Sequence, residues 1–475
     1  MINTRFAPSP TGEPHIGNFR TALFEYLAAK HEGGNFYLRI EDTDRTRYVE
    51  GSVEKIIAGL KWLGLAPDNI NKIMYQSARL DIYKKFALQL VDEGKAYICT
   101  CTKEQLDDDR KQQEASKKPT GYMGHCREKG IKIEDVEEGK YVIRMKMPRE
   151  GKIVFDDMVR GRVEFDLSLS DDQIILKSDG FPTYHLAAVV DDHEMKTTYA
   201  IRGEEWLSST PKHLILYQMF GWDAPKFAHL SMILAPDKAK LSKRHGATGL
   251  TEYKALGYLP EAIVNFLALL GWNPGDEREF FTLLELEKEF TLDHVNKAPA
   301  VFNMDKLNSI NQYYLSRLIQ DSKPRICQLL SEFDLDNISD GELDLLGRGG
   351  YKTLREMADA ILELRKEPEY EAKILVFKKS DIERTKLALE KAIEILTEND
   401  EWNSTQLQEK LSMVVSQNNL TNGDVFWAVR VALSGKERSP SPVELMLALG
   451  QIESNKRLNI ALEKLATIED NLVSS

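Results

Sequence analysis

The chain has few cysteines and no long apolar run, and both absences narrow what it can be. Four cysteines among 475 residues do not make the disulfide framework of a small secreted domain. The longest apolar stretch, near residues 262–270, is far too short to span a membrane. The first residues lead directly into a predicted strand, without the charged segment and apolar core of a signal peptide. We therefore expect a cytoplasmic protein that does not associate with membranes.

A general excess of positive charge is also missing. The 63 lysines and arginines are outnumbered by 75 aspartates and glutamates, which gives a net charge of −12. This balance excludes a protein that coats nucleic acid without specificity, because such binding needs a broad positive surface. It does not exclude a specific RNA ligand, whose phosphates need only local basic patches. The length predicts two to four domains, and the sequence contains no internal repeat.

The most informative segment runs from residue 5 to residue 18, with the sequence RFAPSPTGEPHIGN. Its prolines and first glycine exclude regular structure and predict a stiff loop after a short strand. From Ile16 onward, apolar residues recur at spacings of three and four, which predicts a helix. His15 and Gly17 would then lie at the helix N-terminus, where free N–H groups and the helix dipole favour phosphate. A lone histidine there is more often only a helix cap, so the interpretation needs a second motif.

The second motif is Lys240-Leu241-Ser242-Lys243-Arg244, with three cations in five residues. Alone, such a run is typical of an exposed basic surface. Together with the His-Ile-Gly segment, it resembles the paired HIGH and KMSKS elements of class I aminoacyl-tRNA synthetases. The segments RFAPSPTG at 5–12 and RIEDTD at 39–44 are similar to the bacterial-type glutamyl-tRNA synthetases in particular. The specific motifs extend to about residue 320, and weaker similarity continues to the C-terminus.

The residue pattern and the resemblance agree on the fold class. Strand and helix patterns alternate in the first 75 residues and resume near residue 181, which predicts an α/β core. The resemblance implies that this core is a Rossmann-like catalytic domain, with an inserted domain that receives the tRNA acceptor end. The last third shows helical periodicity only, and the resemblance implies an all-α anticodon-binding region there. The expected division is residues 1–75 with 181–252 for the catalytic domain, 76–180 for the insertion, 253–321 for a helical stem-contact region and 322–475 for the anticodon-binding domain.

The resemblance implies separate residues for the amino acid and for ATP. An arginine fork can hold a carboxylate through two hydrogen bonds, and a carboxylate suits the ammonium group. The positions implied to bind glutamate are Arg5, Ala7, Ser9, Glu41, Tyr184 and Arg202. Those implied to bind ATP, with Mg²⁺, are His15, Gly17, Glu205, Ile233 and Lys243, and the catalytic group is His15, Gly17, Lys240 and Lys243. Ala188 stands where many relatives carry an asparagine near the substrate, so one substrate hydrogen bond is expected to be missing or supplied by water.

Three of the four cysteines are clustered, in the patterns Cys99-x-Cys101 and Tyr122-x-x-x-Cys126. These patterns resemble the zinc site in the acceptor-binding domain of some glutamyl-tRNA synthetases, and thiolates suit tetrahedral zinc. The resemblance therefore implies a structural Zn²⁺ held by these four residues. His125 and Glu128 are alternatives to Tyr122 as the fourth ligand. Three reduced cysteines without a metal are the other interpretation.

The expected function is ATP-dependent ligation of glutamate to glutamate tRNA through a glutamyl-adenylate, by a monomer. Gly350 aligns by eye with an arginine that rejects the glutamine anticodon in some relatives, so glutamine tRNA is a second candidate substrate. One alternative is a glutaminyl-tRNA synthetase, whose anticodon region is mainly β-barrel. Another is a glutamyl-queuosine tRNA synthetase, which lacks an anticodon-binding domain. A small-molecule ligase with the same nucleotide fold would need no helical tail, and an inactive paralogue would be expected to lose His15, Gly17 or Lys243.

Overall fold

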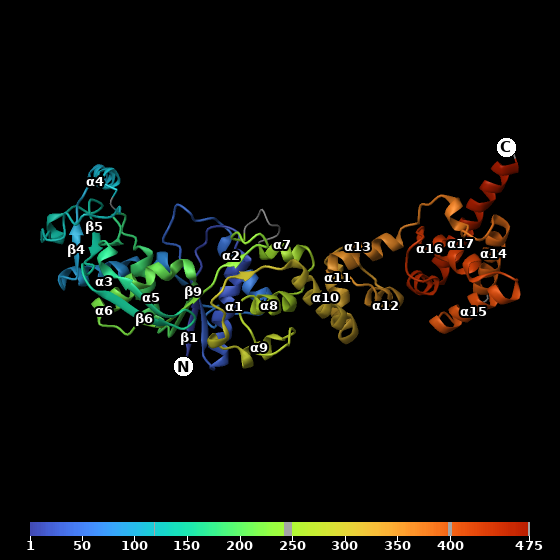
Figure 1. The fold of residues 1–475 in the computed structure, drawn as a ribbon, viewed down its shortest axis with the longest axis horizontal. Helices are drawn as coiled ribbons and strands as arrows, with labels where there is room; N and C mark the ends of the chain where they lie inside the picture. Colours follow the sequence, from blue (N-terminus) through green and yellow to red (C-terminus); the bar gives the residue numbers. More distant parts are fainter. Residues whose placement is uncertain (118, 242–248, 398–400, 474–475) are drawn as a thin grey trace. The chain divides into compact units, whose positions relative to one another are not determined.

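The computed structural model describes residues 1–117, 119–241, 249–397 and 401–473. The chain divides into two compact units (Figure 1). The first contains residues 1–254 and 260–307, and the second contains residues 255–259 and those from 308 onward. No helix in the described ranges is long and apolar enough to cross a membrane.

Parallel strands and flanking helices form the core of the first unit. β1 (Asn3–Phe6), β2 (Asn35–Ile40) and β3 (Met74–Tyr75) pair in parallel in that order. β9 (Tyr199–Gly203) pairs in parallel with β10 (Lys226–Leu230). The backbone N–H of Thr198 donates to the carbonyl of Asn3 at 2.9 Å, so the start of β9 lies beside β1. The predicted α/β nucleotide-binding core is confirmed, and ligands of such cores bind at the carboxyl ends of the strands.

Helix α1 (Ile16–His31) begins where the sequence predicts. Phe19, Leu23 and Leu27 are fully buried, as their spacing requires. His15 is the N-cap: its ring accepts the N–H of Gly17, and its own N–H donates to the Asn18 side chain. These reciprocal bonds satisfy donors that the first turn would otherwise leave free. The other helices beside the parallel strands are α2 (Ser52–Trp62), α5 (Tyr184–Glu194) and α6 (Thr210–Phe220).

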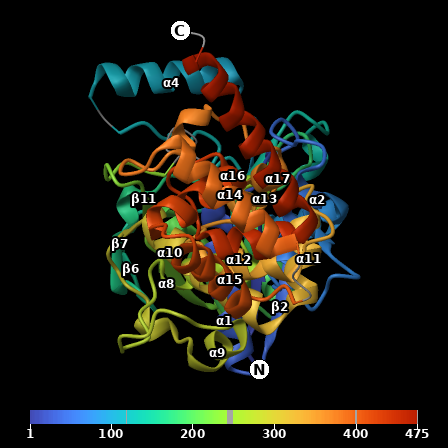
Figure 2. The ribbon, with the colours of Figure 1, turned by 90° about the vertical axis from the view of Figure 1, so that its right-hand side faces the viewer.

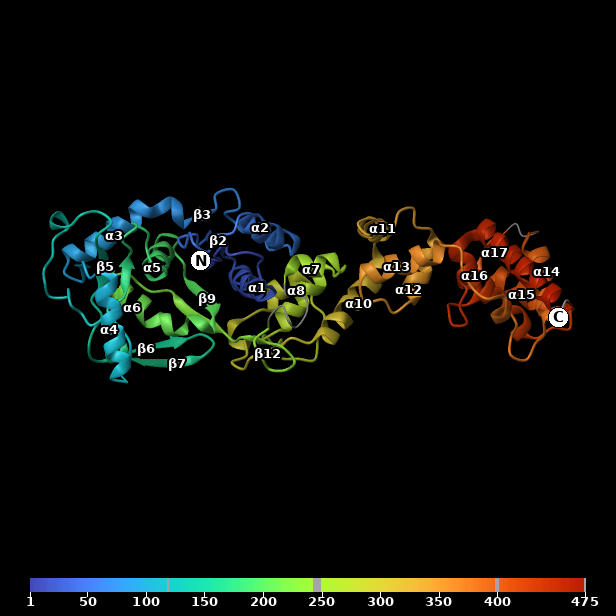
Figure 3. The same ribbon diagram turned by 90° about the horizontal axis from the view of Figure 1, so that it is seen from above.

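Antiparallel strands characterise residues 76–180, between the two halves of the core. β5 (Val142–Met145) lies between β4 (Ala96–Cys99) and β8 (Ile174–Leu176). β6 (Lys152–Asp157) and β7 (Gly161–Asp166) form a hairpin, which Figure 3 shows from above. Helices α3 (Leu80–Asp92) and α4 (Lys103–Ala115) accompany these strands.

Shorter elements complete the first unit. β11 (Ile233–Leu234) pairs in parallel with β12 (Ala300–Val301). The helices in this part are α7 (Leu250–Ala255), α8 (Pro260–Leu269), α9 (Leu283–Glu289) and the start of α10 (Met304–Asp321).

The described part of the second unit contains helices and no strand. α14 (Ile382–Thr397), α15 (Ser404–Gln417), α16 (Ala428–Ser434) and α17 (Pro442–Val473) enclose a core that includes Leu389, Leu411, Val429 and Leu458 (Figure 2). The sequence pattern predicts two helices here, at 442–449 and 455–465, and α17 does consist of two helical stretches, which meet at a kink at Gly450, where φ is 77°. The remaining helices are α11 (Lys323–Ser331), α12 (Asp340–Arg348) and α13 (Leu354–Arg365). The four-part division expected from the sequence stays a prediction.

Candidate active site

A cavity of about 310 Å³ lies at the N-terminus of α1. His15 and Gly17 line it from α1, and Glu205 and Ile233 line it from the segments that follow β9 and β10. Lys240 also lines the cavity, whereas Lys243 lies outside the described residues. Four of the five residues expected to bind ATP therefore face one space. Its position at the carboxyl ends of parallel strands is typical of a nucleotide site.

The hydrogen bonds of His15 determine which of its atoms can act on a ligand. Nδ1 accepts the N–H of Gly17 at 3.1 Å, so the neutral ring carries its proton on Nε2. Nε2 is buried and has no partner among the described residues. Burial, together with the nearby positive charge of Lys240, lowers the pKa of the His15 ring. The ring is therefore neutral at pH 7 and can donate Nε2–H to an anionic oxygen.

Gly17 leaves the space that a flat ring would need. A Cβ atom on Gly17 would lie 3.4 Å from Nδ1 of His15 and 3.6 Å from Cδ1 of Ile233. Any larger side chain would extend into the gap between these two residues. Arg20, one turn further along α1, also lines the cavity and donates to the carbonyl groups of Ser231 and Leu270.

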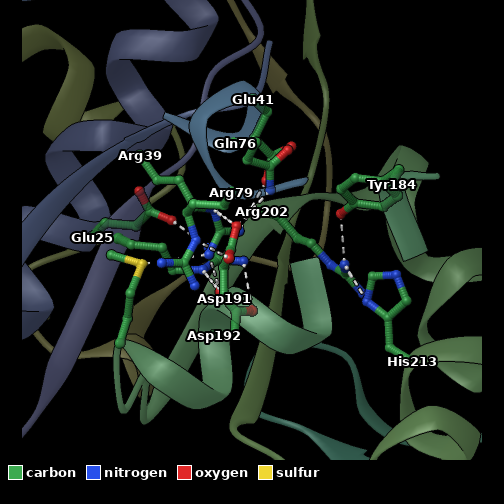
Figure 4. A network of polar contacts seen from close by, with 12 residues as sticks. Glu25, Arg39, Glu41, Gln76, Arg79, Tyr184, Asp191, Asp192, Arg202 and His213 are labelled. Atoms are coloured by element: carbon green, nitrogen blue, oxygen red, sulfur yellow. Dashed lines mark hydrogen bonds and ion pairs between the residues drawn. The ribbon is translucent and has the colours of Figure 1, made fainter. Parts of the chain in front are cut away.

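Arg202 is a buried cation whose described hydrogen-bond partners are all neutral, and Figure 4 shows its contacts with Tyr184 and His213. Nη1 donates to the hydroxyl of Tyr184 at 2.9 Å and lies 3.3 Å from Nδ1 of His213. Nε donates to Nε2 of His229 at 3.1 Å, and Nη2 donates to Oγ1 of Thr210 at 2.8 Å. No carboxylate of the described ranges forms an ion pair with this guanidinium. Its charge, and the second N–H of Nη2, thus remain for an anionic ligand.

The groups around Arg202 are held in their neutral forms. Burial raises the pKa of Tyr184. Burial also lowers the pKa of His213 well below the usual value, and Arg202 adds to the effect. Because the Tyr184 oxygen accepts from Arg202, its hydroxyl hydrogen is directed elsewhere and can be donated to a ligand. The Tyr184 ring packs against Trp206, with 4.4 Å between ring centroids.

Arg5 differs from Arg202 because carboxylates already surround it. Nε and Nη2 donate to the two oxygens of Asp192 at 2.8 and 3.2 Å, and Nη1 donates to Glu25 at 3.2 Å. Burial opposes ionisation of Asp192, but Arg5 and Arg39 outweigh it and lower its pKa to about 2. Three of the five N–H groups of Arg5 are used in this way, and two remain.

Arg39 links this cluster to Glu41. Its Nη1 donates to Asp192 at 2.6 Å and its Nη2 to Glu41 at 2.9 Å. Burial raises the pKa of the Glu41 carboxyl, and Arg39 opposes that rise. The backbone N–H of Glu41 donates to the carbonyl of Pro8 at 3.0 Å, which joins the loop containing Ala7 and Ser9 to the end of β2. Figure 4 shows Glu41 and Tyr184 near Arg202.

Residues 1–309 match the family described as tRNA synthetases class I (E and Q), catalytic domain. The chain belongs to this synthetase family. Residues 310–462 match the anticodon binding domain family.

Relatives of this synthetase match nearly its whole length. A glutamate–tRNA ligase of Dehalococcoides mccartyi is 44% identical over 98% of both chains. Glutamate–tRNA ligase 2 of Thermoanaerobacter pseudethanolicus is 43% identical, over 97% of this chain and 98% of the relative. A crystal structure of a glutamate tRNA ligase from Elizabethkingia meningosepticum, in complex with its amino acid, superposes with a TM-score of 0.86. That structure is 36% identical and covers 98% of this chain and 99% of its own.

The sequence reasoning about the synthetase site missed the residues that surround the arginines. Arg39 stands between Leu38 and Ile40 in a buried strand, and Asp192 follows the apolar run 186–190 of α5. Such charges inside buried segments are a usable signal, because a buried charge requires a partner. Asp157 and His229, whose contacts are described below, gave no comparable signal.

The cysteine cluster of the synthetase lies away from this site, in the antiparallel region. One sulfur each from Cys99, Cys101 and Cys126 lies within 4.8 Å of the other two. The Tyr122 hydroxyl lies 3.3 Å from the Cys99 sulfur and 3.6 Å from the Cys101 sulfur. His125 instead pairs with an aspartate, Asp109, at 2.6 Å. The donor set of three sulfurs and one phenol oxygen is thus assembled as the sequence predicts, and it suits Zn²⁺.

Proposed function

We propose that this synthetase ligates glutamate to the 3′ end of tRNA in two steps, with ATP as the energy source. The observation that carries the proposal is Arg202, a buried guanidinium whose described partners are all neutral. A buried cation of this kind favours an anionic ligand. The names of the relatives, glutamate–tRNA ligases at 43–44% identity, identify that ligand as glutamate.

We assign the amino acid to the space beside Arg202, Tyr184 and Glu41. One carboxylate would accept from the free N–H of Arg202 and the hydroxyl of Tyr184. The Glu41 carboxylate would accept from the ammonium group, and the arriving positive charge would offset its raised pKa. Arg5 would offer its two remaining N–H groups to the second carboxylate, and we assign Ala7 and Ser9 to the same site because the loop that carries them is bonded to Glu41 through Pro8.

ATP is assigned to the 310 Å³ cavity at α1. A glutamate carboxylate oxygen attacks the α-phosphorus, an O–P bond forms, and the bond to the β-phosphate oxygen breaks to release pyrophosphate. Nε2–H of His15 donates to a phosphate oxygen, and Lys240 and Lys243 add positive charge as negative charge moves to the leaving group. Mg²⁺, when bound with ATP, supplies further neutralisation of the phosphates.

Transfer to tRNA completes the reaction. The 2′-hydroxyl of the terminal adenosine attacks the carbonyl carbon of glutamyl-adenylate, the C–O bond to AMP breaks, and the hydroxyl proton leaves with AMP or solvent. The match of residues 310–462 to an anticodon binding domain supports tRNA as the acceptor. The helical character of the second unit disfavours a glutaminyl enzyme, for which a β-barrel is expected.

The decisive experiment is charging of purified glutamate tRNA with radiolabelled glutamate, glutamine or aspartate. We expect product with glutamate alone, together with glutamate-dependent ATP–pyrophosphate exchange when tRNA is present. His15→Ala is expected to retain tRNA binding and to lose most of the exchange activity. Equal charging with glutamine, or no charging at all, would refute the assignment.

We also propose that the cysteine cluster holds a structural Zn²⁺, with Tyr122 as the fourth ligand. The support is the short distance among the three sulfurs and the hydroxyl beside them. Metal analysis of protein purified without chelators should give close to one zinc per chain. Tyr122→Phe should weaken zinc retention, and Cys327→Ser, which changes the cysteine outside the cluster, should not. Metal-free protein with full activity and unchanged melting would contradict the proposal.

We further propose that glutamine tRNA is also charged with glutamate. Gly350 supports this, because the nearest atom to a Cβ there would be the Gln312 amide nitrogen, at 3.5 Å. An arginine could therefore be accommodated, and the chain carries none at that position. Gly350→Arg should abolish charging of glutamine tRNA and preserve charging of glutamate tRNA. Gly350→Ala is the matched control, and an absence of glutamine tRNA charging by the wild type would end this part of the proposal.

A further inference from the structure

A chain of three buried side chains reaches Arg202 from the β6–β7 hairpin. Asp157 is the last residue of β6, His229 is on β10, and Arg202 is on β9. Oδ2 of Asp157 lies 2.5 Å from Nδ1 of His229, and both side chains are fully buried. Nε2 of the same ring lies 3.1 Å from Nε of Arg202. None of the steps proposed above uses Asp157 or His229.

The direction of each hydrogen bond in this chain is determined. An arginine Nε–H can only donate, so Nε2 of His229 must be the acceptor. The ring proton of neutral His229 is consequently on Nδ1 and is donated to Asp157. Burial lowers the pKa of His229, and its bond to Asp157 opposes that change without reversing it. The hydroxyl of Thr210, 3.2 Å from Nε2, is compatible with this tautomer.

Asp157 is itself held firmly by backbone donors. Its Oδ1 accepts the N–H groups of Val159 at 3.0 Å, Arg160 at 2.8 Å and His229 at 3.2 Å. Burial would raise the pKa of the carboxyl, but the His229 ring and these N–H groups outweigh it and lower the pKa. One oxygen therefore anchors the hairpin turn, and the other is left for the imidazole alone.

We propose that Asp157 and His229 are positioning residues for glutamate, which fix the Arg202 guanidinium in its substrate-binding orientation through a single histidine tautomer. This inference rests on the proposed function. In this arrangement the Asp157 carboxylate does not contact Arg202 directly, because the His229 ring lies between them. A carboxylate in direct contact with the guanidinium, such as Asp192 against Arg5, would neutralise the charge of Arg202 at close range. The neutral imidazole holds the guanidinium by Nε, and Tyr184, His213 and Thr210 hold Nη1 and Nη2, so that one N–H of Nη2 is left for the substrate.

Asp157→Asn is the most direct test, because it replaces a single oxygen of the Asp157 carboxylate by an NH₂ group. The amide oxygen can keep the three backbone bonds of Oδ1, while the amide NH₂ replaces Oδ2 and faces Nδ1 of His229. The ring proton would then move to Nε2 and confront the N–H of Arg202. We expect the KM for glutamate to rise about 10- to 100-fold, by analogy with the loss of a carboxylate that orients a metal-binding histidine. The KM for ATP and the melting temperature should change little.

Asp156→Asn is the matched control, since Asp156 is the exposed neighbour on the same strand. It should leave every constant unchanged. In a His229→Gln background, Asp157→Asn should add almost nothing to the KM for glutamate, because the connecting ring is gone. The ¹⁵N NMR spectrum of labelled histidine, assigned by comparison with His229→Gln, should show the Nδ1–H tautomer in the wild type and the Nε2–H tautomer in Asp157→Asn.

The results separate this inference from the proposed function. A wild type that fails to charge glutamate would refute the function, while the NMR spectrum would still report the tautomer. An active wild type with a KM for glutamate that Asp157→Asn leaves within twofold would overturn the inference. Additive effects of Asp157→Asn and His229→Gln would also overturn it, as would a rise in KM that is matched by equal changes for ATP and by a large fall in melting temperature.

Discussion

Replacing Arg202 by lysine tests the central claim about glutamate binding. The change keeps the positive charge and removes the planar fork. Arg202 has five N–H groups, and its contacts with four neutral acceptors leave one for the substrate. A lysine ammonium has three donors, so it cannot serve all four acceptors and the substrate. We therefore expect Arg202→Lys to bind glutamate more weakly and to have a lower free energy of unfolding than the wild type.

The size of the effect follows from the bond that is lost. A hydrogen bond to a charged group contributes about 1.5–3 kcal/mol, which corresponds to roughly a 10- to 100-fold higher KM for glutamate. One acceptor left unsatisfied in the protein costs about 1–3 kcal/mol of unfolding free energy. The KM for ATP should be unaffected, because the cavity residues do not include Arg202.

Steady-state aminoacylation at varied glutamate, with melting curves recorded with and without glutamate, measures both effects. Arg79→Lys is the control, since its guanidinium already pairs with Asp191 and Glu194. It should leave the KM for glutamate unchanged. A KM for Arg202→Lys within twofold of the wild type, or an equal rise in Arg79→Lys, would refute the reasoning.

Two further predictions concern pH and the basic motif Lys240-Leu241-Ser242-Lys243-Arg244. His185 lies on α5, and burial, with the charges of Lys212 and Arg202, lowers the pKa of its ring to about 4. Between pH 6.5 and pH 4 this histidine is therefore protonated in the unfolded chain and neutral in the native protein. The free energy of unfolding of the wild type should therefore fall between pH 7.5 and pH 5, by on the order of 2 kcal/mol from this residue. Denaturant titrations at the two pH values should show a correspondingly smaller fall for His185→Gln. Lys243→Ala should slow ATP–pyrophosphate exchange by about two to three orders of magnitude. It should leave tRNA binding, measured by filter retention, largely unchanged, and near-normal exchange would contradict its role.

Local pattern was sufficient to predict the elements that carry the site. The helix from Ile16, the strand 35–40 and the helices of the second unit all depend on periodicity within one segment, and the structure confirms them. The bounds predicted for the strand (35–41) and for two helices of the second unit (381–396 and 405–415) differ by one or two residues from those of β2, α14 and α15, because helix and strand ends depend on capping contacts. The break between the helices predicted at 442–449 and 455–465 is confirmed, and it lies at Gly450.

The contacts between distant segments could not be predicted in the same way. Asp157 and Arg202 are separated by 45 positions, counted from their residue numbers, and they are linked through His229 only because β6 and β9 both pack against β10. Nothing near Asp157 in the sequence distinguishes it from the exposed Asp156. The sequence motifs were sufficient to predict which residue types the candidate site contains. The hydrogen-bond partners of Arg5 and Arg202 could be identified only from the structure.

Arg5 is paired with carboxylates, whereas Arg202 contacts only neutral groups among the described residues. Thr210→Asp tests whether glutamate binding depends on the unpaired charge of Arg202. Oγ1 of Thr210 accepts from Nη2 of Arg202 at 2.8 Å, at the first residue of α6. An aspartate there would place a carboxylate on the guanidinium and a negative charge at a helix N-terminus, which is favourable. The protein should keep its melting temperature or gain stability, yet the KM for glutamate should rise at least 100-fold, because the charge meant for the substrate is neutralised internally. Thr210→Asn, which adds a similar side chain without charge, should have a much smaller effect. If Thr210→Asp binds glutamate normally, the availability of the Arg202 charge does not determine substrate binding.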